Sequence, residues 1–269
     1  MVGRPRLTIA TVVKDDDEGL RRTLDSLASA LTQHEQLLII DSSVDASATR
    51  ALIAMTGVSH DYAWVEPQGV YAAMNTALDL AEGEYIWFVN AGDQLHSQAA
   101  LADVRYTIAG DPQWAYGRVR FHDVHGRASS PPNFDYEAES RAGFARGLFP
   151  SHQGTIVRTE ALKDIGGFDT TFSVAADYVA MLRFSQLARP AISDAIWADF
   201  YEGGLSTQRW RTAVTEFHRA RRLVLKPTGL AALVERAATA QQLVTKGVYR
   251  TLLAPGRPLG HTWTKIRRS

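Results

Sequence analysis

Short apolar runs alternate with amphipathic stretches through the first third of the chain. Four runs rich in β-branched and aromatic residues have the composition of strands buried on both faces, as in parallel sheets. They cover residues 7–13, 37–40, 62–65 and 85–89. Apolar residues at three- and four-residue steps predict intervening helices, within residues 20–31, 48–55 and 70–81. This alternation predicts an α/β domain with a doubly wound, mostly parallel sheet.

Polar side chains follow each of these predicted strands. The fourth strand ends in the turn Asn90-Ala91-Gly92-Asp93, and the others are followed by Asp15, Asp41, Asp45 and Glu66. Ligands of open α/β sheets bind beyond the carboxyl ends of the strands, so these side chains would share one edge. Carboxylates gathered at one edge repel one another unless a divalent cation or the donor groups of a ligand compensate their charge. The pattern therefore predicts a cation or nucleotide site. The alternative is that Asn90 and Asp93 only form a turn and cap a helix.

Beyond Asp93 the periodicity weakens. The pattern predicts a helix over residues 99–108, a strand over 114–121, a long loop over 122–147 and a strand over 151–158. Loops of that length are usually functional or mobile. A short helix should then end at Gly166-Gly167, and another should begin at Ala175-Ala176-Asp177.

Several classes of protein are excluded or disfavoured by what the sequence lacks. It contains no cysteine, which excludes disulfides, a thiolate nucleophile and a cysteine-ligated zinc site. It has neither the glycine-rich Rossmann fingerprint nor a phosphate-cradling P-loop. No apolar stretch is long enough for a signal peptide or a membrane span, so we expect a cytoplasmic protein.

The net charge of zero conceals two oppositely charged parts. Residues 205–269 hold 13 of the 29 basic residues but only 2 of the 29 acidic ones, a net charge of +11. We therefore expect a main domain over 1–206 and a basic, mostly helical extension over 207–269. The extension suits an amphipathic helix on an anionic membrane surface. The alternative is a helical hairpin packed on the main domain or on a second subunit of a homodimer, and we expect no nucleic-acid binding.

An ordered set of motifs resembles the family 2 inverting glycosyltransferases, which have a GT-A fold. The resemblance covers roughly residues 7 to 206, and each motif alone is weak. The matching segments are Thr11-Val12-Val13, Ile39 to Asp45, Glu66 to Asn75, Gly83 to Asp93, Ser151-His152-Gln153, Ile165 to Asp169 and Ala175 to Tyr178. The resemblance implies a hexosyltransferase-type enzyme that moves a sugar from a nucleotide-sugar to a hydroxyl acceptor.

The same resemblance assigns roles to residues of this sequence. It implies that Asp177 is the general base, that Asp93 ends the metal-binding motif for Mg²⁺ or Mn²⁺, and that Asp41 contacts the nucleotide base. His152 and Gln153 would contact the acceptor. The donor-binding residues it implies are Val13, Asp41, Asp45, Tyr71, Asn75, Asn90 and Ala91. The family's acidic motif often begins with Asp, whereas this chain has Asn90, so Asp93 and the diphosphate would hold the metal.

Structural alternatives exist for several of these residues, and other functions compete. Asp177, Asp41 and Asp45 could each only start a helix, and His152 could be a packed structural residue. A sugar-1-phosphate nucleotidyltransferase should carry a glycine-rich loop after the first strand, but Lys14 is followed there by three Asp. A non-catalytic nucleotide-sugar-binding protein is the other alternative. The basic extension without a predicted membrane span favours a lipid-linked glycan or glycolipid acceptor, as in cell-envelope biosynthesis.

Overall fold

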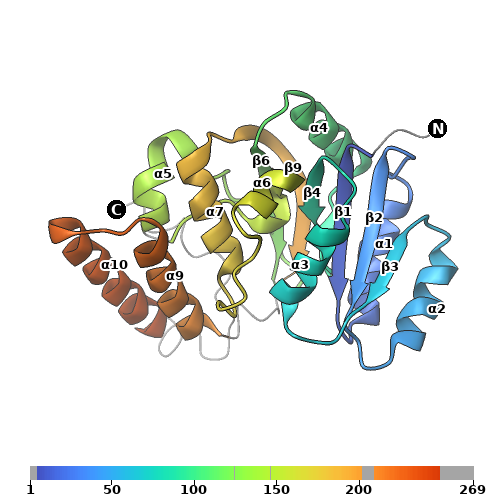
Figure 1. The fold of residues 1–269 in the computed structure, drawn as a ribbon, viewed down its shortest axis with the longest axis horizontal. Helices are drawn as coiled ribbons and strands as arrows, with labels where there is room; N and C mark the ends of the chain where they lie inside the picture. The colour runs from blue at the N-terminus through green and yellow to red at the C-terminus, as the bar shows by residue number, and fades with distance from the viewer. Residues whose placement is uncertain (1–4, 124, 146, 202–208, 249–269) are drawn as a thin grey trace.

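The chain forms one mixed β-sheet covered by helices on both faces (Figure 1). The computed structural model describes residues 5–123, 125–145, 147–201 and 209–248. Within them the strand order is β3-β2-β1-β4-β8-β6-β9-β5, and β7 pairs with β6. The strands are β1 (Leu7–Val13), β2 (Glu35–Asp41), β3 (Asp61–Trp64), β4 (Tyr85–Phe88), β5 (Gln94–Leu95), β6 (Trp114–His122), β7 (Ala128–Ser129), β8 (Thr155–Arg158) and β9 (Ala191–Tyr201).

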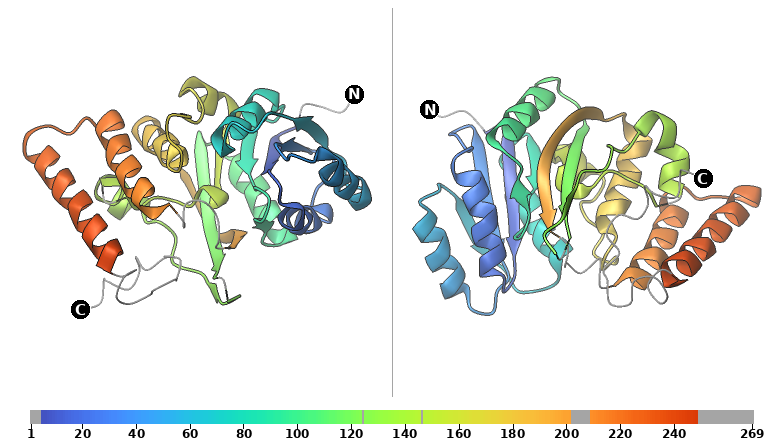
Figure 2. Two further views of the ribbon diagram at one scale, coloured as in Figure 1. Left: turned by 90° about the horizontal axis from the view of Figure 1, so that it is seen from below. Right: turned by 180° about the vertical axis from the view of Figure 1, so that it is seen from behind.

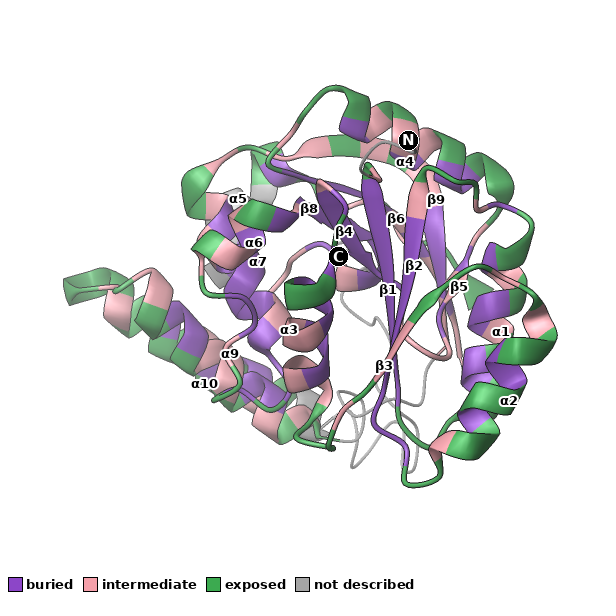
Figure 3. Cartoon of the chain, turned by 45° about the vertical axis from the view of Figure 1, so that its right-hand side comes forward, coloured by how far each residue is buried: buried purple, intermediate pink, exposed green. Residues whose placement is uncertain are grey.

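The first four strands are parallel and alternate with helices, as the apolar pattern predicts. Helices α1 (Asp17–Ala28), α2 (Ala46–Thr56) and α3 (Val70–Leu80) connect them. The buried apolar faces of these helices cover the sheet, and β1, β2 and β4 are buried on both faces (Figure 3). Gly83, which follows α3, serves close packing: a Cβ there would lie 2.4 Å from the backbone nitrogen of Thr8.

The second half of the sheet is mixed. Strand β8 runs antiparallel to β4 and β6, while β9 runs parallel to β6 and antiparallel to β5. The predicted loop over 122–147 contains β7 and a helix, α5 (Tyr136–Ala145). The predicted strand over 151–158 begins instead with a 3-10 turn, η1 (His152–Gly154). Helices α4 (Gln98–Ala109), α6 (Thr159–Asp164) and α7 (Ala176–Leu187) complete this half.

The two faces of the sheet bury separate hydrophobic cores. Helices α3, α6 and α7 lie over one face, and α1, α2 and α4 lie over the other (Figures 1 and 2). Trp87 of β4 and Trp197 of β9 are fully buried in the second core, with ring centroids 6.3 Å apart. Because β4 is central and covered on both faces, the loop that follows it is held on a rigid support.

The C-terminal region that the structure describes is a helical hairpin. Helices α9 (Trp210–Val224) and α10 (Gly229–Val248) pack together, and α9 packs on α7 (Figure 1). Between them, the fully buried Arg221 donates to Glu235 (2.8 Å) and to Thr239 Oγ1 (2.8 Å). A buried ion pair of this kind demands a defined helix register, because either charge alone would be strongly unfavourable. The hairpin packed on the main domain, one of the two expected arrangements, is therefore present for residues 210–248.

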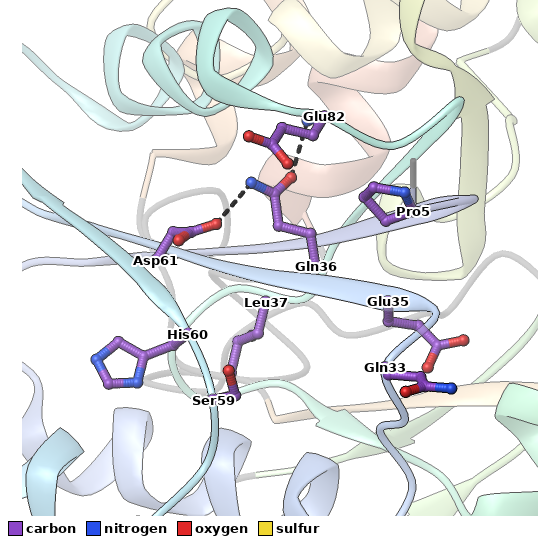
Figure 4. A pocket seen from close by; sticks show the side chains of 9 residues that line it. All are labelled: Pro5, Gln33, Glu35, Gln36, Leu37, Ser59, His60, Asp61 and Glu82. Atoms are coloured by element: carbon purple, nitrogen blue, oxygen red, sulfur yellow. Dashed lines mark hydrogen bonds between the residues drawn. The ribbon is translucent and has the colours of Figure 1, made fainter. Parts of the chain in front are cut away.

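A hollow of about 280 Å³ lies at the amino ends of the parallel strands (Figure 4). Gln36 lines it, accepting a hydrogen bond from the Glu82 backbone N–H and donating one to Asp61 (2.8 Å each). The hollow therefore lies at the sheet edge opposite the loops that follow β1 to β4. Among the described helices, none is long and apolar enough to cross a membrane.

Candidate functional site

The loops after β1 to β4 are joined at the carboxyl edge of the sheet. The backbone N–H of Asp15, a residue with a φ of 51°, donates to Ser43 Oγ (2.8 Å). Trp64 Nε1 donates to the Ser43 carbonyl (3.0 Å), and Ala91 N donates to the Val12 carbonyl (3.1 Å). The expected gathering of these strand ends is thus confirmed.

Asp41 ends β2 with its carboxylate fully buried. Its Oδ1 accepts a hydrogen bond from the Ser43 backbone N–H (2.7 Å), and its Oδ2 accepts one from the Tyr62 hydroxyl (2.8 Å). Val13 lies beside it in the β1–β2 register and is itself a core residue. Asp41 does not cap α2, so the helix-start alternative is wrong for this residue. Its contact with a nucleotide base stays a prediction.

Two other expected donor-binding residues make local contacts. Asp45 is exposed and caps α2, accepting from the Ser47 N–H at 3.0 Å. Asn75 uses both polar groups of its side chain on the backbone of Phe168, donating to the carbonyl and accepting from the N–H at 2.8 Å each. These bonds hold the turn at Gly167, which has a φ of 66°. Whether either residue also contacts a donor stays a prediction.

The Asn90–Asp93 turn is held by α1. The buried hydroxyl of Thr23 donates to the Asp93 carbonyl (2.6 Å) and accepts from the Gly92 N–H (3.1 Å). The Asp93 N–H donates to the Asn90 carbonyl (2.9 Å), and Gly92 has a φ of 97°. A residue with a side chain is strained at that φ, so glycine suits this turn. Sequence analysis missed Thr23, since one threonine inside a helix carries no motif signal.

The side chains of this turn have the character of hard-cation ligands. The Asp93 carboxylate is 6% exposed, and burial raises its pKa to about 8 despite a backbone hydrogen bond from Asn90. In the described part of the chain, no basic side chain forms an ion pair with it. Asn90 Oδ1 is also buried, without a hydrogen-bond partner in the structure. A buried carboxylate with no ion pair among the described residues and a buried amide oxygen with no hydrogen-bond partner fit Mg²⁺ or Mn²⁺.

The chain alone does not complete a metal site. Within residues 5–123, 125–145, 147–201 and 209–248, no group of three His, Cys, Asp or Glu side chains is placed to hold a metal ion. Mg²⁺ commonly binds through one or two carboxylates together with substrate phosphates and water. The site therefore fits a metal that arrives with, or is completed by, a diphosphate.

Asp177 lies on the other side of the β4 end, in the first turn of α7. Its Oδ1 accepts a hydrogen bond from the Tyr71 hydroxyl at 3.0 Å, and the Tyr71 ring stacks on Phe168 at 5.9 Å. Burial, with the adjacent Asp177 carboxylate, raises the pKa of Tyr71 well above its usual value, so this hydroxyl stays a donor. The residue before α7 is Ala175, so Asp177 is not the N-cap, and the capping alternative is wrong.

His152 and Asp177 line the same small apolar cavity, of about 30 Å³, with Phe88 at the end of β4. His152 Nδ1 is buried and has no hydrogen-bond partner in the structure. Burial lowers the pKa of His152, and this effect outweighs that of the Asp177 carboxylate, which raises it. The imidazole is therefore neutral at pH 7. Gln153 is buried, and its carbonyl accepts from Trp87 Nε1 at 2.7 Å, which fixes η1 on β4.

The architecture is that of the GT-A fold. The structure is similar to residues 1–349 of TarS from S. aureus solved with UDP-GlcNAc, with a TM-score of 0.65 and 18% identity over 92% of this chain and 76% of that one. It is also similar to the mannosyltransferase PcManGT from Pyrobaculum calidifontis, solved with GDP-Man and Mn²⁺. That TM-score is 0.61, with 18% identity over 94% of this chain and 78% of that one. A second crystal structure of S. aureus TarS contains a longer chain, of which this chain covers 44%.

The sequence model of glycosyl transferase family 2 matches residues 8–166, and the chain belongs to that family. An uncharacterized glycosyltransferase of Mycobacterium tuberculosis is 24% identical over 222 residues, covering 80% of this chain and 82% of that protein. A PGL/p-HBAD biosynthesis glycosyltransferase of the same species is 32% identical over 113 residues, which is 41% of each chain. The predicted fold and family are confirmed, and the chain is a glycosyltransferase.

Proposed function

We propose that this glycosyltransferase moves a hexosyl group from a nucleotide-sugar to a hydroxyl acceptor with inversion. The observation that carries the proposal is the half-buried Asp177 carboxylate, which is oriented by the Tyr71 hydroxyl at 3.0 Å and lines a cavity with Phe88 of β4. The metal-binding turn at Asn90 to Asp93 follows the same strand. A general base and a diphosphate site at the same edge of the sheet suit a single displacement of the diphosphate from the anomeric carbon of the sugar.

In that displacement the acceptor oxygen attacks the anomeric carbon from the face opposite the diphosphate. The new carbon–oxygen bond forms as the bond to the diphosphate oxygen breaks, which inverts the anomeric centre. Asp177 takes the hydroxyl proton, a role that requires a carboxylate within hydrogen-bond reach of the nucleophile. The neutral imidazole of His152 and the fixed backbone of Gln153 border the acceptor side.

Asp93 and Asn90 would hold Mg²⁺ or Mn²⁺ together with the donor diphosphate. When bound, such an ion neutralises the negative charge that develops on the leaving nucleoside diphosphate. Asp41 and the loop after β2 would hold the nucleoside, because they lie on the same sheet edge two strands away from β4.

A thermal-shift screen tests this proposal. UDP-GlcNAc and GDP-mannose are the first probes, each with and without Mn²⁺, since a ligand of the native state raises its melting temperature. We expect at least one nucleotide-sugar to stabilise the protein in a Mn²⁺-dependent manner and to release its nucleoside diphosphate on incubation. Binding with no turnover, even with glycolipid acceptors, would favour the non-catalytic alternative. Release of pyrophosphate from a nucleoside triphosphate and a sugar 1-phosphate would favour the nucleotidyltransferase.

A lipid-linked glycan or glycolipid at the cytosolic membrane face is the acceptor class that we propose. Helix α10 exposes an apolar stripe opposite the side that contacts α9, made of Leu230, Leu233, Val234 and Val244, each at least 60% exposed. The exposed Arg236 lies on the same helix, and apolar and basic side chains together suit anionic lipid.

Replacing Leu230, Leu233 and Val234 together with serine should weaken binding of the protein to anionic vesicles. The reason is that insertion of apolar side chains supplies part of the binding, while the basic residues supply a part that salt screens. Co-sedimentation with anionic and neutral vesicles at rising salt measures both the apolar and the electrostatic contribution to binding. Surface substitutions suit this test better than truncation, because removing the hairpin would also remove the contacts of α9 with α7.

A matched control replaces Met55 and Tyr106 with serine, since both are exposed apolar residues outside the hairpin. This control should bind vesicles as the wild type does. Equal vesicle binding by the stripe variant and the wild type would refute the membrane proposal. Loss of a dimer in the stripe variant would point to packing against a second subunit instead.

A further inference from the structure

A carboxylate from α9 holds the segment that precedes α7. Glu216 Oε1 accepts hydrogen bonds from the backbone N–H and the hydroxyl of Ser173, each at 2.8 Å. Its Oε2 accepts from the backbone N–H groups of Val174 and Ala175, at 2.8 and 3.0 Å. Helix α7 has no side-chain cap of its own, because Ala175 stands at the N-cap position. The C-terminal hairpin therefore supplies the acceptor that this segment lacks.

Two further side chains of α9 contact residues on either side of Asp177. Arg219 donates to the carbonyl of Thr171 (3.1 Å) and to its hydroxyl (2.6 Å). The ring of Phe217 packs on that of Tyr178, with centroids 4.6 Å apart. The backbone around Asp177 is thus held by α9 both before and after the reactive side chain.

We propose that Glu216 is a positioning residue that sets the place of Asp177 in the active site. This inference rests on the function proposed above. Asp177 stands only two residues beyond Ala175, so any shift of the segment that Glu216 binds moves the carboxylate relative to Tyr71 on α3. A misplacement of about 1 Å can lower a rate by about 10²-fold.

The competing interpretation is that Glu216 only stabilises the fold. The two interpretations differ in what they predict for catalysis by the molecules that remain folded. A purely stabilising residue lowers the melting temperature and leaves kcat per folded molecule unchanged. A positioning residue lowers kcat while the donor site, built on β1 to β4, keeps its affinity.

Kinetics of Glu216→Ala in the 269-residue chain test the proposal. The readout is Mn²⁺-dependent hydrolysis of UDP-GlcNAc or GDP-mannose, whichever stabilises the wild type more. We expect kcat to fall at least about tenfold with donor Kd within about twofold, since only an interaction beside the base is lost. Glu216→Gln keeps one acceptor oxygen, so its kcat should lie between that of Glu216→Ala and that of the wild type. Thr215→Ala is the control, because Thr215 is exposed and, among the described residues, its hydroxyl donates only to carbonyls of α9.

A double-mutant cycle with Asp177→Asn shows whether Glu216 acts through the base. If it does, Glu216→Ala should lower kcat little further in the Asp177→Asn background, since residues that act as a unit are not additive. The same fold-reduction in both backgrounds would overturn the proposal. So would unchanged kcat in Glu216→Ala alone.

Hydrogen exchange gives a readout that does not depend on the donor. In Glu216→Ala the backbone amides of residues 173–178 should exchange faster than in the wild type, while Thr215→Ala should leave them unchanged. Exchange at wild-type rates in Glu216→Ala would overturn the positioning role. A wild-type chain that hydrolyses and transfers no nucleotide-sugar would overturn the proposed function instead, and the exchange rates would still decide whether Glu216 holds this segment.

Discussion

Replacing Asp177 with asparagine should lower kcat by at least about 10²-fold, since general-base catalysis typically contributes 10²–10⁴-fold. Asparagine has nearly the same shape and can still accept the hydrogen bond from Tyr71, so α7 should keep its place. It cannot take a proton from the acceptor. Donor affinity should stay close to that of the wild type, because Asp41 and the Asn90–Asp93 turn lie on other elements. Steady-state kinetics together with donor titration measure both quantities.

Asp79→Asn is the matched control for this variant. Asp79 lies exposed on α3, outside the matched motifs. Its replacement should leave kcat, donor affinity and melting temperature unchanged. Wild-type turnover by Asp177→Asn would remove Asp177 from the role of base. A loss of donor binding together with a lower melting temperature would show that Asp177 matters mainly for structure.

Asp93→Asn should abolish the part of donor binding that depends on Mn²⁺. An amide is neutral and a weak ligand for a hard divalent cation, whereas the ionised carboxylate of Asp93 supplies both charge and oxygen. The metal-free fold should be no less stable, because burial raises the pKa of Asp93 to about 8 and the carboxyl is then largely protonated at pH 7, so a neutral amide of the same shape replaces a neutral group. Melting temperatures with and without Mn²⁺ and donor separate these two effects.

For this second variant, Asp25→Asn is the control. Asp25 is exposed on α1 and stands near Thr23 in the sequence. The control should keep the full Mn²⁺-dependent rise in melting temperature. Should Asp93→Asn show the same rise, Asp93 is not a metal ligand. A lower melting temperature in the absence of any ligand would mean that the carboxylate supports the turn rather than the metal.

The first half of the fold follows from local pattern. Strands β1, β2 and β4 are apolar on both faces, and their helices carry apolar residues at helical spacing, so each element is specified within its own segment. Parallel strands also bring their carboxyl ends to one edge. For that reason the sequence alone predicts that the polar residues Asp15, Asp41, Asn90 and Asp93 lie close together.

The second half departs from simple alternation, and the pattern there was less informative. Strand β8 runs antiparallel to β4, and the predicted loop over 122–147 includes α5. Strand β9 was not predicted, since its buried and exposed positions mix Asp194, Asp199 and apolar residues without a clear period. Strand direction depends on how the chain returns to the sheet, which the composition of a segment does not encode.

By itself the sequence determined the fold class, the family and the identity of the acidic residues at the sheet edge. Only the tertiary structure decided which groups act on them. Tyr71 reaches Asp177 across 106 residues, and Glu216 holds the start of α7 across about 40 residues. These contacts join helices that are far apart in the chain, and a single hydroxyl or carboxylate on a helix face leaves no periodic signal. The burial that raises the pKa of Asp93 likewise depends on how β4 and α1 pack together.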